Sequence, residues 1–229
     1  MAMRPKRKQA AGRGGNRGAK AAAAAPRERI VDAFMTLVAE RGLVATRLAD
    51  IAGAADVTLA ELRAEFPGKL AILSAFSQRI DEVVLAGGPA EGEGAKDRLF
   101  DILMRRLDAL TPYKAALRQM AKTARRSPGF AAVLSVMARR SQRWMHAAAG
   151  IDRGGVTGAI ARQGGVLVFA QTLRTWLDDD DPDLAKTMKT LDEALGRGDR
   201  AMRMMNDVCG VVCRIAGAAR GRAEQRAAG

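Results

Sequence analysis

The side chains best suited to catalysis or metal binding are few in this chain, and they are scattered. The sequence holds one histidine, His146, and two cysteines, Cys209 and Cys213. Two cysteines four residues apart on one helix share a face but have poor geometry for a disulfide. With a single histidine as a further ligand, they also fall short of a usual zinc site. We therefore expect no metal, no cofactor, two buried thiols and a structural role for His146.

An acidic run and a group of glycines also have plain structural explanations. Asp178–Asp181 and Asp183 could hold a hard cation, but an acidic loop that caps the following helix is the simpler interpretation. The glycines between residues 154 and 164 resemble a phosphate loop only superficially, because no strand precedes them and no Gly-Lys-Ser/Thr follows. These patterns predict a protein that is not an enzyme.

Phosphate binding by lysine and arginine is the chemistry that the chain supplies best. The net charge is +13, and residues 1–25 contain seven Lys or Arg and no acidic residue. This Gly- and Ala-rich tail lacks a hydrophobic period, so we expect it to be disordered when it is alone. It either follows DNA phosphates or a minor groove, gaining affinity by counterion release, or it is a solvated tail.

Composition favours an all-α protein inside the cell. Of the 229 residues, 48% are hydrophobic but only 4% are aromatic, and no long stretch alternates with period two. Residues 21–25 are too few and too weakly apolar for a signal-peptide core. No segment reaches the roughly 20 apolar residues of a membrane span. We expect a cytoplasmic protein.

Residues 26–76 have the pattern of three short helices and the start of a fourth. Ile30, Phe34 and Leu37 share one face of the first helix, which Pro26 precedes and Gly42 ends. Thr46 is placed to cap the second helix, and a turn follows at residues 53–56. Thr58 and Glu61 form a capping box that opens the third helix. This order of elements predicts a helix-turn-helix, which places one helix in the DNA major groove.

An ordered set of residues in this segment resembles the N-terminal domain of TetR-family transcriptional regulators. The set covers about a fifth of the chain and consists of residues 39–42 (AERG), 45–46 (AT) and 50–52 (DIA), with Ala55, Val57, Thr58, Leu62, Phe66 and Lys69. The sequence departs from the family at Asp56, Ala60, Arg63 and Glu65, where the family favours Gly, Gly, Tyr and His. Arg63 is able to replace a phosphate donor, whereas a carboxylate at Glu65 repels phosphate.

The resemblance implies a DNA-binding regulator, a ligand-responsive repressor that acts as a homodimer on a palindromic operator. The residues that we assign to DNA binding are Thr46, Arg47, Thr58, Leu59, Ala60, Arg63 and Lys69. Thr46 and Lys69 would anchor phosphates at helix N-termini. We divide the chain into a basic tail (1–25), a helix-turn-helix domain (26–76), and a ligand-binding and dimerisation domain (77–229).

Beyond residue 76 the pattern is helix after helix, giving about nine or ten in all. We expect one helix to begin at Asp181-Pro182 and to end at Gly196 and Gly198, and the last helix to begin at Asp199. The resemblance implies that the last two long helices form the dimer interface. A pocket for a lipophilic ligand is assigned to Met104, Trp144, Phe169, Leu173 and Trp176.

Residues 164–202 carry a second resemblance, to a lipid-binding accessory family of ubiquinone biosynthesis that shares the TetR fold. It rests on Leu173, Trp176-Leu177-Asp178, Asp181-Pro182, Thr187-Met188 and Leu191-Asp192. It implies the alternative function, a lipid-binding accessory protein in which DNA binding has been lost.

Overall fold

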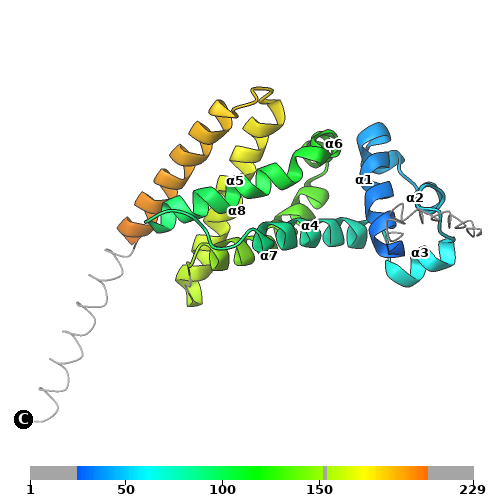
Figure 1. Ribbon diagram of the computed structural model, residues 1–229, viewed down its shortest axis with the longest axis horizontal. Helices are drawn as coiled ribbons and strands as arrows, with labels where there is room; N and C mark the ends of the chain where they lie inside the picture. The colour runs from blue at the N-terminus through cyan, green and yellow to red at the C-terminus, as the bar shows by residue number, and fades with distance from the viewer. Residues whose placement is uncertain (1–24, 152–153, 206–229) are drawn as a thin grey trace, which may run out of the picture.

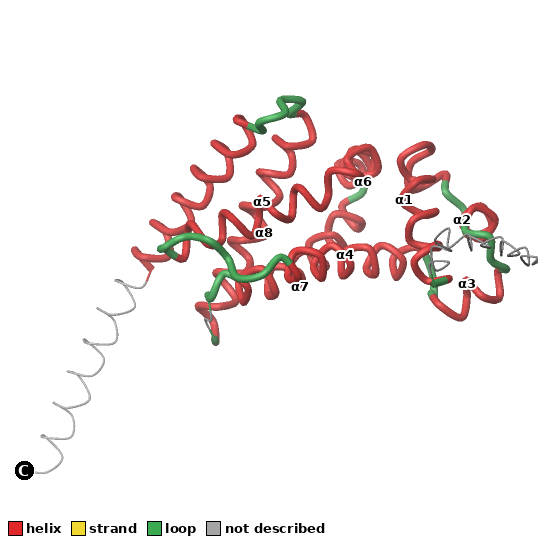
Figure 2. Tube along the Cα trace, in the orientation of Figure 1, coloured by secondary structure: helices red, strands yellow, loops and turns green. Residues whose placement is uncertain are grey.

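The structure is a computed structural model that describes residues 25–151 and 154–205, and these residues form helices joined by loops, without any strand (Figures 1 and 2). The helices within these ranges are α1 (Pro26–Ala45), α2 (Leu48–Ala54), α3 (Leu59–Glu65), α4 (Lys69–Ala86), α5 (Ala95–Leu110), α6 (Lys114–Arg126), α7 (Pro128–Ala148) and α8 (Gly155–Asp178). A 3-10 turn (Thr111–Tyr113) precedes α6, and residues 185–205 form a further helical segment. The all-α fold is confirmed, and the number of helices is close to the expected one.

Helices α1 to α3 form a head at one end of the molecule, and α4 leaves this head to run into the body (Figure 1). The head also touches the body where α1 packs on α6. One apolar core extends from Ile30 in α1 through Phe76 in α4 to Leu195 in the last helical segment. The head and the body are therefore joined by buried contacts as well as by the chain.

The helix ends follow the signals in the sequence at several places. Gly42 interrupts α1 with φ 80° and ψ 162°, a left-handed φ that glycine adopts without a steric penalty. Ser127 caps α7, its hydroxyl accepting a hydrogen bond from the Phe130 N–H at 3.3 Å. Helices α6 and α7 are therefore separate elements that meet at Ser127.

Two expectations near the C-terminal side are wrong. Asp181 and Pro182 lie in a turn, and the helix begins at residue 185, because Asp179 supplies the acceptor for its first turn. The Asp179 carboxylate accepts hydrogen bonds from the Thr187 hydroxyl at 2.7 Å and the Thr187 N–H at 3.0 Å. The hydroxyl contact holds the pKa of Asp179 below its usual value. Gly196 lies inside a continuous helix instead of ending one.

The reason for that continuity is packing, since Leu191, Ala194 and Leu195 are buried on the same helix. Arg197 Nη2 also donates to Gln171 Oε1 of α8 at 3.1 Å, so the segment returns alongside α8. A tertiary contact of this kind outweighs the modest cost of glycine in a helix. Residues 206–229, with Cys209, Cys213 and the remainder of the expected dimer helix, lie outside the described residues.

Candidate nucleic-acid interface

Helices α2 and α3 form a helix-turn-helix whose inner side is held by apolar contacts. Ile51, Leu62 and Phe66 are almost fully buried, and both helices pack against α1. Asp56 in the intervening turn has φ 51°. Aspartate is among the few residues other than glycine that adopt this left-handed conformation, so Asp56 can serve at a turn position where the resembling family has glycine.

The first turn of α3 is fixed by the capping box that the sequence predicts. Thr58 Oγ1 accepts from the Glu61 N–H at 3.1 Å, and Glu61 Oε2 accepts from the Thr58 N–H at 2.7 Å and from its hydroxyl at 2.9 Å. The Thr58 N–H lowers the pKa of Glu61 below its usual value, so this carboxylate stays charged. The Thr58 hydroxyl thus holds the helix end, while the neighbouring Leu59 and Ala60 are exposed.

Arg63 lies on the exposed side of α3. Its guanidinium makes no ion pair or hydrogen bond with another residue in the described part of the chain. A guanidinium offers five N–H donors in a planar fork, which matches phosphate oxygens and the edge of guanine. Arg63 is therefore the cation of α3 that is free to bind an external anion.

The Glu65 carboxylate at the end of α3 is paired with α1. Arg27 Nη1 lies 3.4 Å from Glu65 Oε2, and it also donates to the Glu65 carbonyl at 3.3 Å. The Arg27 guanidinium sits 4.4 Å from the centre of the Phe66 ring. The sequence does not reveal this pair, because it joins residues 38 apart in the chain.

Arg47 precedes α2 and its side chain is 82% exposed, with Nε 3.5 Å from Asp50 Oδ2. The Arg47 N–H donates to the same carboxylate at 3.2 Å, which lowers the pKa of Asp50. Nη1 of a second arginine, Arg41, lies 3.8 Å from Asp50 Oδ2. Arg47 is accessible to a phosphate, and one carboxylate is shared between two arginines there.

The assignment of Thr46 as a phosphate anchor is wrong. Thr46 is fully buried, and its hydroxyl donates to the Gly42 carbonyl at 2.9 Å. It does not cap α2, which Arg47 precedes directly. The reason is the break at Gly42, which leaves carbonyl groups at the end of α1 that need donors.

Lys69 serves the same helix end. Its Nζ donates to the Leu43 and Thr46 carbonyls, each at 2.9 Å. The side chain is therefore largely committed to the end of α1. Because Lys69 is the first residue of α4, these two bonds tie the start of α4 to the head.

A second tie between α4 and the head is Arg79. It bonds Glu28 at 2.9 Å and Asp32 at 2.8 Å, both on α1, and the Tyr113 hydroxyl at 3.0 Å. Burial favours the neutral form of Arg79 and so lowers its pKa. The bonds to Asp32 and Glu28 outweigh this effect and hold the pKa of Arg79 above its usual value. The head is therefore coupled to α4 at both Lys69 and Arg79.

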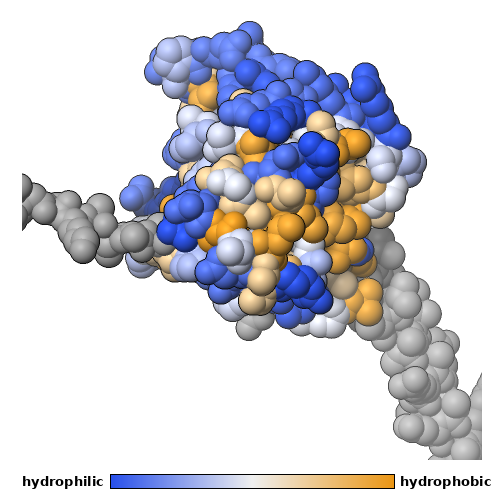
Figure 3. Space-filling view, turned by 90° about the vertical axis from the view of Figure 1, so that its right-hand side faces the viewer, coloured by the Kyte–Doolittle hydropathy of each residue, from blue (hydrophilic) through white to orange (hydrophobic). Residues whose placement is uncertain are grey.

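The end of the molecule that carries the head presents apolar groups among hydrophilic ones (Figure 3). Large apolar side chains exposed in the head and at the start of α4 are Val44 (81%), Leu48, Leu59 and Leu70. Residues 26–69 contain six Lys or Arg and seven Asp or Glu. The head therefore adds no net positive charge, and its affinity for an anion depends on where individual arginines lie.

The body contains a cavity of about 450 Å³ whose walls come from α4 to α8. Of the residues assigned to a ligand pocket, Phe169 and Leu173 line this cavity, whereas Met104, Trp144 and Trp176 do not. Trp176 is buried beneath Lys114, whose Nζ lies 5.1 Å from the ring. Met104 packs against the main core. Met104 and Trp176 are excluded from the cavity because they pack into the core. Helical periodicity alone does not reveal this packing.

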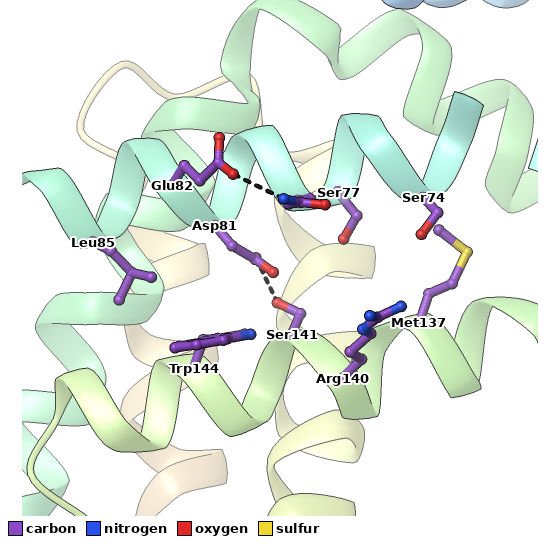
Figure 4. Close-up of a pocket in the computed structure, with 10 residues that line it drawn as sticks. Ser74, Ser77, Asp81, Glu82, Leu85, Met137, Arg140, Ser141 and Trp144 are labelled. Atoms are coloured by element: carbon purple, nitrogen blue, oxygen red, sulfur yellow. Dashed lines mark hydrogen bonds between the residues drawn. The ribbon is translucent and has the colours of Figure 1, made fainter. Parts of the chain in front are cut away.

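Trp144 lies instead beside a separate groove of about 300 Å³ between α4 and α7 (Figure 4). It is 53% exposed. The floor of this groove holds Asp81 of α4, which accepts a hydrogen bond from Ser141 of α7 at 2.7 Å. Asp81 also forms a buried ion pair with Arg106 of α5.

The histidine and the acidic side chains of the described residues form no metal site. His146 is buried on α7, with Nδ1 2.8 Å from the Gln142 carbonyl oxygen. No three His, Cys, Asp or Glu side chains within residues 25–151 and 154–205 are grouped to hold a metal ion. None of the helices in those ranges is long and apolar enough to cross a membrane.

Comparison with known proteins identifies the architecture. No protein-family model and no curated protein matches the sequence. A crystal structure of a TetR transcriptional regulator from Nitrosomonas europaea matches with a TM-score of 0.60 and 24% identity, covering 76% of this chain and 97% of that one. A second, from Rhodococcus sp. RHA1, gives a TM-score of 0.55 and 20% identity, covering 76% and 95%. The protein has the TetR fold, as its helix-turn-helix residues predict.

Proposed function

We propose that the protein is a DNA-binding transcriptional regulator, a ligand-responsive repressor that binds a palindromic operator as a homodimer. The observation that carries this proposal is the capped, outward-facing helix α3 with Arg63, which has no ion-pair partner within the described residues. The solved proteins of the same fold are described as transcriptional regulators. In the proposed complex Thr58, Leu59, Ala60 and Arg63 face the groove, and Arg47 lies near the DNA backbone.

Ligand control would pass through α4. Leu73, Phe76 and Ile80 of this helix line the cavity, while Lys69 and Arg79 bind it to the head. A ligand that fits the cavity better in one position of α4 would shift the population toward that position. In a dimer this shift would change the separation of the two heads and so the affinity for an operator.

Glu65→Gln tests DNA binding directly. The change removes a negative charge beside the proposed interface and releases Arg27, so we expect non-specific duplex DNA to bind roughly two- to fivefold more tightly at low salt. Thermal stability should stay nearly unchanged, since an exposed substitution is usually within about 0.5 kcal/mol. Fluorescence anisotropy with labelled duplexes at two salt concentrations measures the effect.

The control is Glu93→Gln, an equal change of charge in the loop between α4 and α5. It should leave DNA affinity unchanged. A Glu65→Gln protein that melts earlier and binds DNA more weakly would show that the Arg27 contact holds α3 in place. If neither the parent nor the variant binds any DNA at low salt, the proposed function is wrong.

Deleting residues 1–24 tests the basic tail. The deletion removes all seven of its Lys and Arg residues but keeps Ala25, whose carbonyl accepts the Glu28 N–H at 2.9 Å. If the tail binds phosphates, affinity should fall for every DNA sequence, and the slope of log K against log salt should flatten by about 0.9 for each phosphate that the tail neutralised. A full-length variant with the seven residues changed to Gln separates charge from length. An unchanged salt slope would make the segment a solvated tail.

The lipid-binding accessory function remains the second candidate, and the balance of charge in the head favours it. With more acidic than basic residues between 26 and 69, the head lacks the excess of positive charge that supplies non-specific DNA affinity. In that case the cavity would hold the functional ligand, and the head would serve as a scaffold. The DNA titrations above decide between the two.

A further inference from the structure

The charged side chains that line the 450 Å³ cavity are all arginines: Arg106, Arg125 and Arg174. No Asp or Glu is among the described residues of its wall, which is otherwise mostly apolar. A cavity with apolar walls and charge of a single sign favours a ligand with an apolar body and one group of the opposite charge. The class of ligand then depends on which arginine still lacks a partner.

The charge of Arg106 is already compensated within the protein. Its guanidinium pairs with Asp81, and it lies 5.3 Å from the centre of the Phe169 ring. Asp81 is in turn bonded to Ser141 on the side of the α4–α7 groove (Figure 4). A second carboxylate at Arg106 would have to compete with Asp81. Arg106 is therefore part of the wall, and its pairing leaves little positive charge for a ligand.

Arg125 and Arg174 are different, because both are exposed and neither forms an ion pair in the described part of the chain. They come from α6 and α8, on two walls of the cavity. Since both arginines line the cavity and also reach solvent, we place the mouth of the cavity beside them. A water-exposed mouth is where a charged group keeps part of its hydration.

The stretch of chain that contains Arg125 is also rich in positive charge. Residues 109–151 contain eight Lys or Arg and no Asp or Glu. Two of these cations are engaged at the end of α8, where Lys114 Nζ donates to the Asp179 carbonyl at 2.6 Å and Arg118 Nε to the Leu177 carbonyl at 2.7 Å. Arg125 is not among them. An anion at the mouth therefore meets no acidic side chain from α6 or α7.

We propose that the cavity binds an elongated amphiphile with a single carboxylate, such as a medium-chain fatty acid. Its apolar chain lies against Phe169 and Leu173, and its carboxylate is held at the mouth by Arg125 and Arg174. This inference deepens the ligand-responsive part of the proposed function. Its test needs no DNA, so that the two can fail separately.

The experiment compares decanoate with 1-decanol, which share the apolar chain and differ in charge. Isothermal titration calorimetry on the full-length protein at low salt should show that the parent binds decanoate more tightly. The double variant Arg125→Gln/Arg174→Gln should lose about two- to thirtyfold in decanoate affinity, the range of two partly exposed charge contacts. Its affinity for 1-decanol should not change, because the apolar walls are intact.

The matched control is Arg126→Gln/Arg143→Gln, which removes two exposed arginines of α6 and α7 outside the cavity wall. It should keep the preference for decanoate. Three results would overturn the proposal: equal affinity of the parent for both compounds, no binding of either, or an equal loss in the control variant. If the protein binds decanoate but no DNA, the result would support this inference and refute the proposed function as a DNA-binding regulator.

Discussion

Asp81→Asn is expected to lower the free energy of unfolding by roughly 3–5 kcal/mol, the usual cost of removing one partner from a buried ion pair. The side chains of Arg106 and Asp81 are only 8% and 11% exposed. The substitution also weakens the bond that Ser141 donates to the Asp81 carboxylate at 2.7 Å. This network joins three helices of the body, since Asp81, Arg106 and Ser141 come from α4, α5 and α7. Its loss should therefore destabilise the body as a whole.

Urea unfolding followed by circular dichroism measures this effect, and a constant slope against denaturant would show that stability alone has changed. The double variant Asp81→Leu/Arg106→Met should recover much of the loss, since an apolar pair of similar volume is often neutral or stabilising. Asp192→Asn is the matched control. It breaks the exposed contact with Lys96 at 2.6 Å, which should cost at most about 1 kcal/mol. A loss of that size for Asp81→Asn would mean that the pair is effectively solvated.

The features of the head that the sequence predicts are those set by neighbours in the chain. Gly42 ends the regular part of α1 through its φ of 80°. The Thr58–Glu61 capping box involves residues three apart, and the left-handed Asp56 occupies a position where the resembling family has glycine. Each depends on a conformational preference or a local hydrogen bond that a short stretch of residues already contains.

The features that sequence reasoning missed join distant parts of the chain. Arg27 neutralises Glu65 across 38 residues, and Lys69 reaches Leu43 across 26. The Thr46 hydroxyl is bonded to the Gly42 carbonyl at the end of α1, and the fold buries this side chain completely. A single sequence gives the charge and size of these side chains. It does not show which carbonyl or carboxylate the fold brings to each of them.

The cavity illustrates the same limit in the body. Phe169 and Leu173 are four residues apart on α8, so helical spacing places them on one face, and that face borders the cavity. Trp176 lies only three residues further on, yet it is buried under Lys114 of α6. The packing of whole helices decides which part of an apolar face borders a cavity and which part meets a neighbouring helix.

Arg63→Ala is expected to weaken operator binding by roughly 1–3 kcal/mol, or about five- to 150-fold. The thermal midpoint should hardly move, because the side chain is exposed and forms no ion pair within the described residues that the substitution would break. The operator can be selected from random duplexes with the parent protein, and both proteins are then titrated against it by fluorescence anisotropy. Arg143→Ala on α7 is the matched control, since it removes another exposed arginine, this one from the body, and it should bind as the parent does.

The pattern of weakening across DNA sequences identifies what Arg63 touches. If the guanidinium reads a base edge, the variant loses affinity for its selected operator and no longer discriminates at one base pair. If it binds phosphate, affinity falls uniformly and the salt slope decreases by about one. An Arg63→Ala protein with undiminished affinity would remove α3 as the reading helix, because Arg63 is the only basic residue on it.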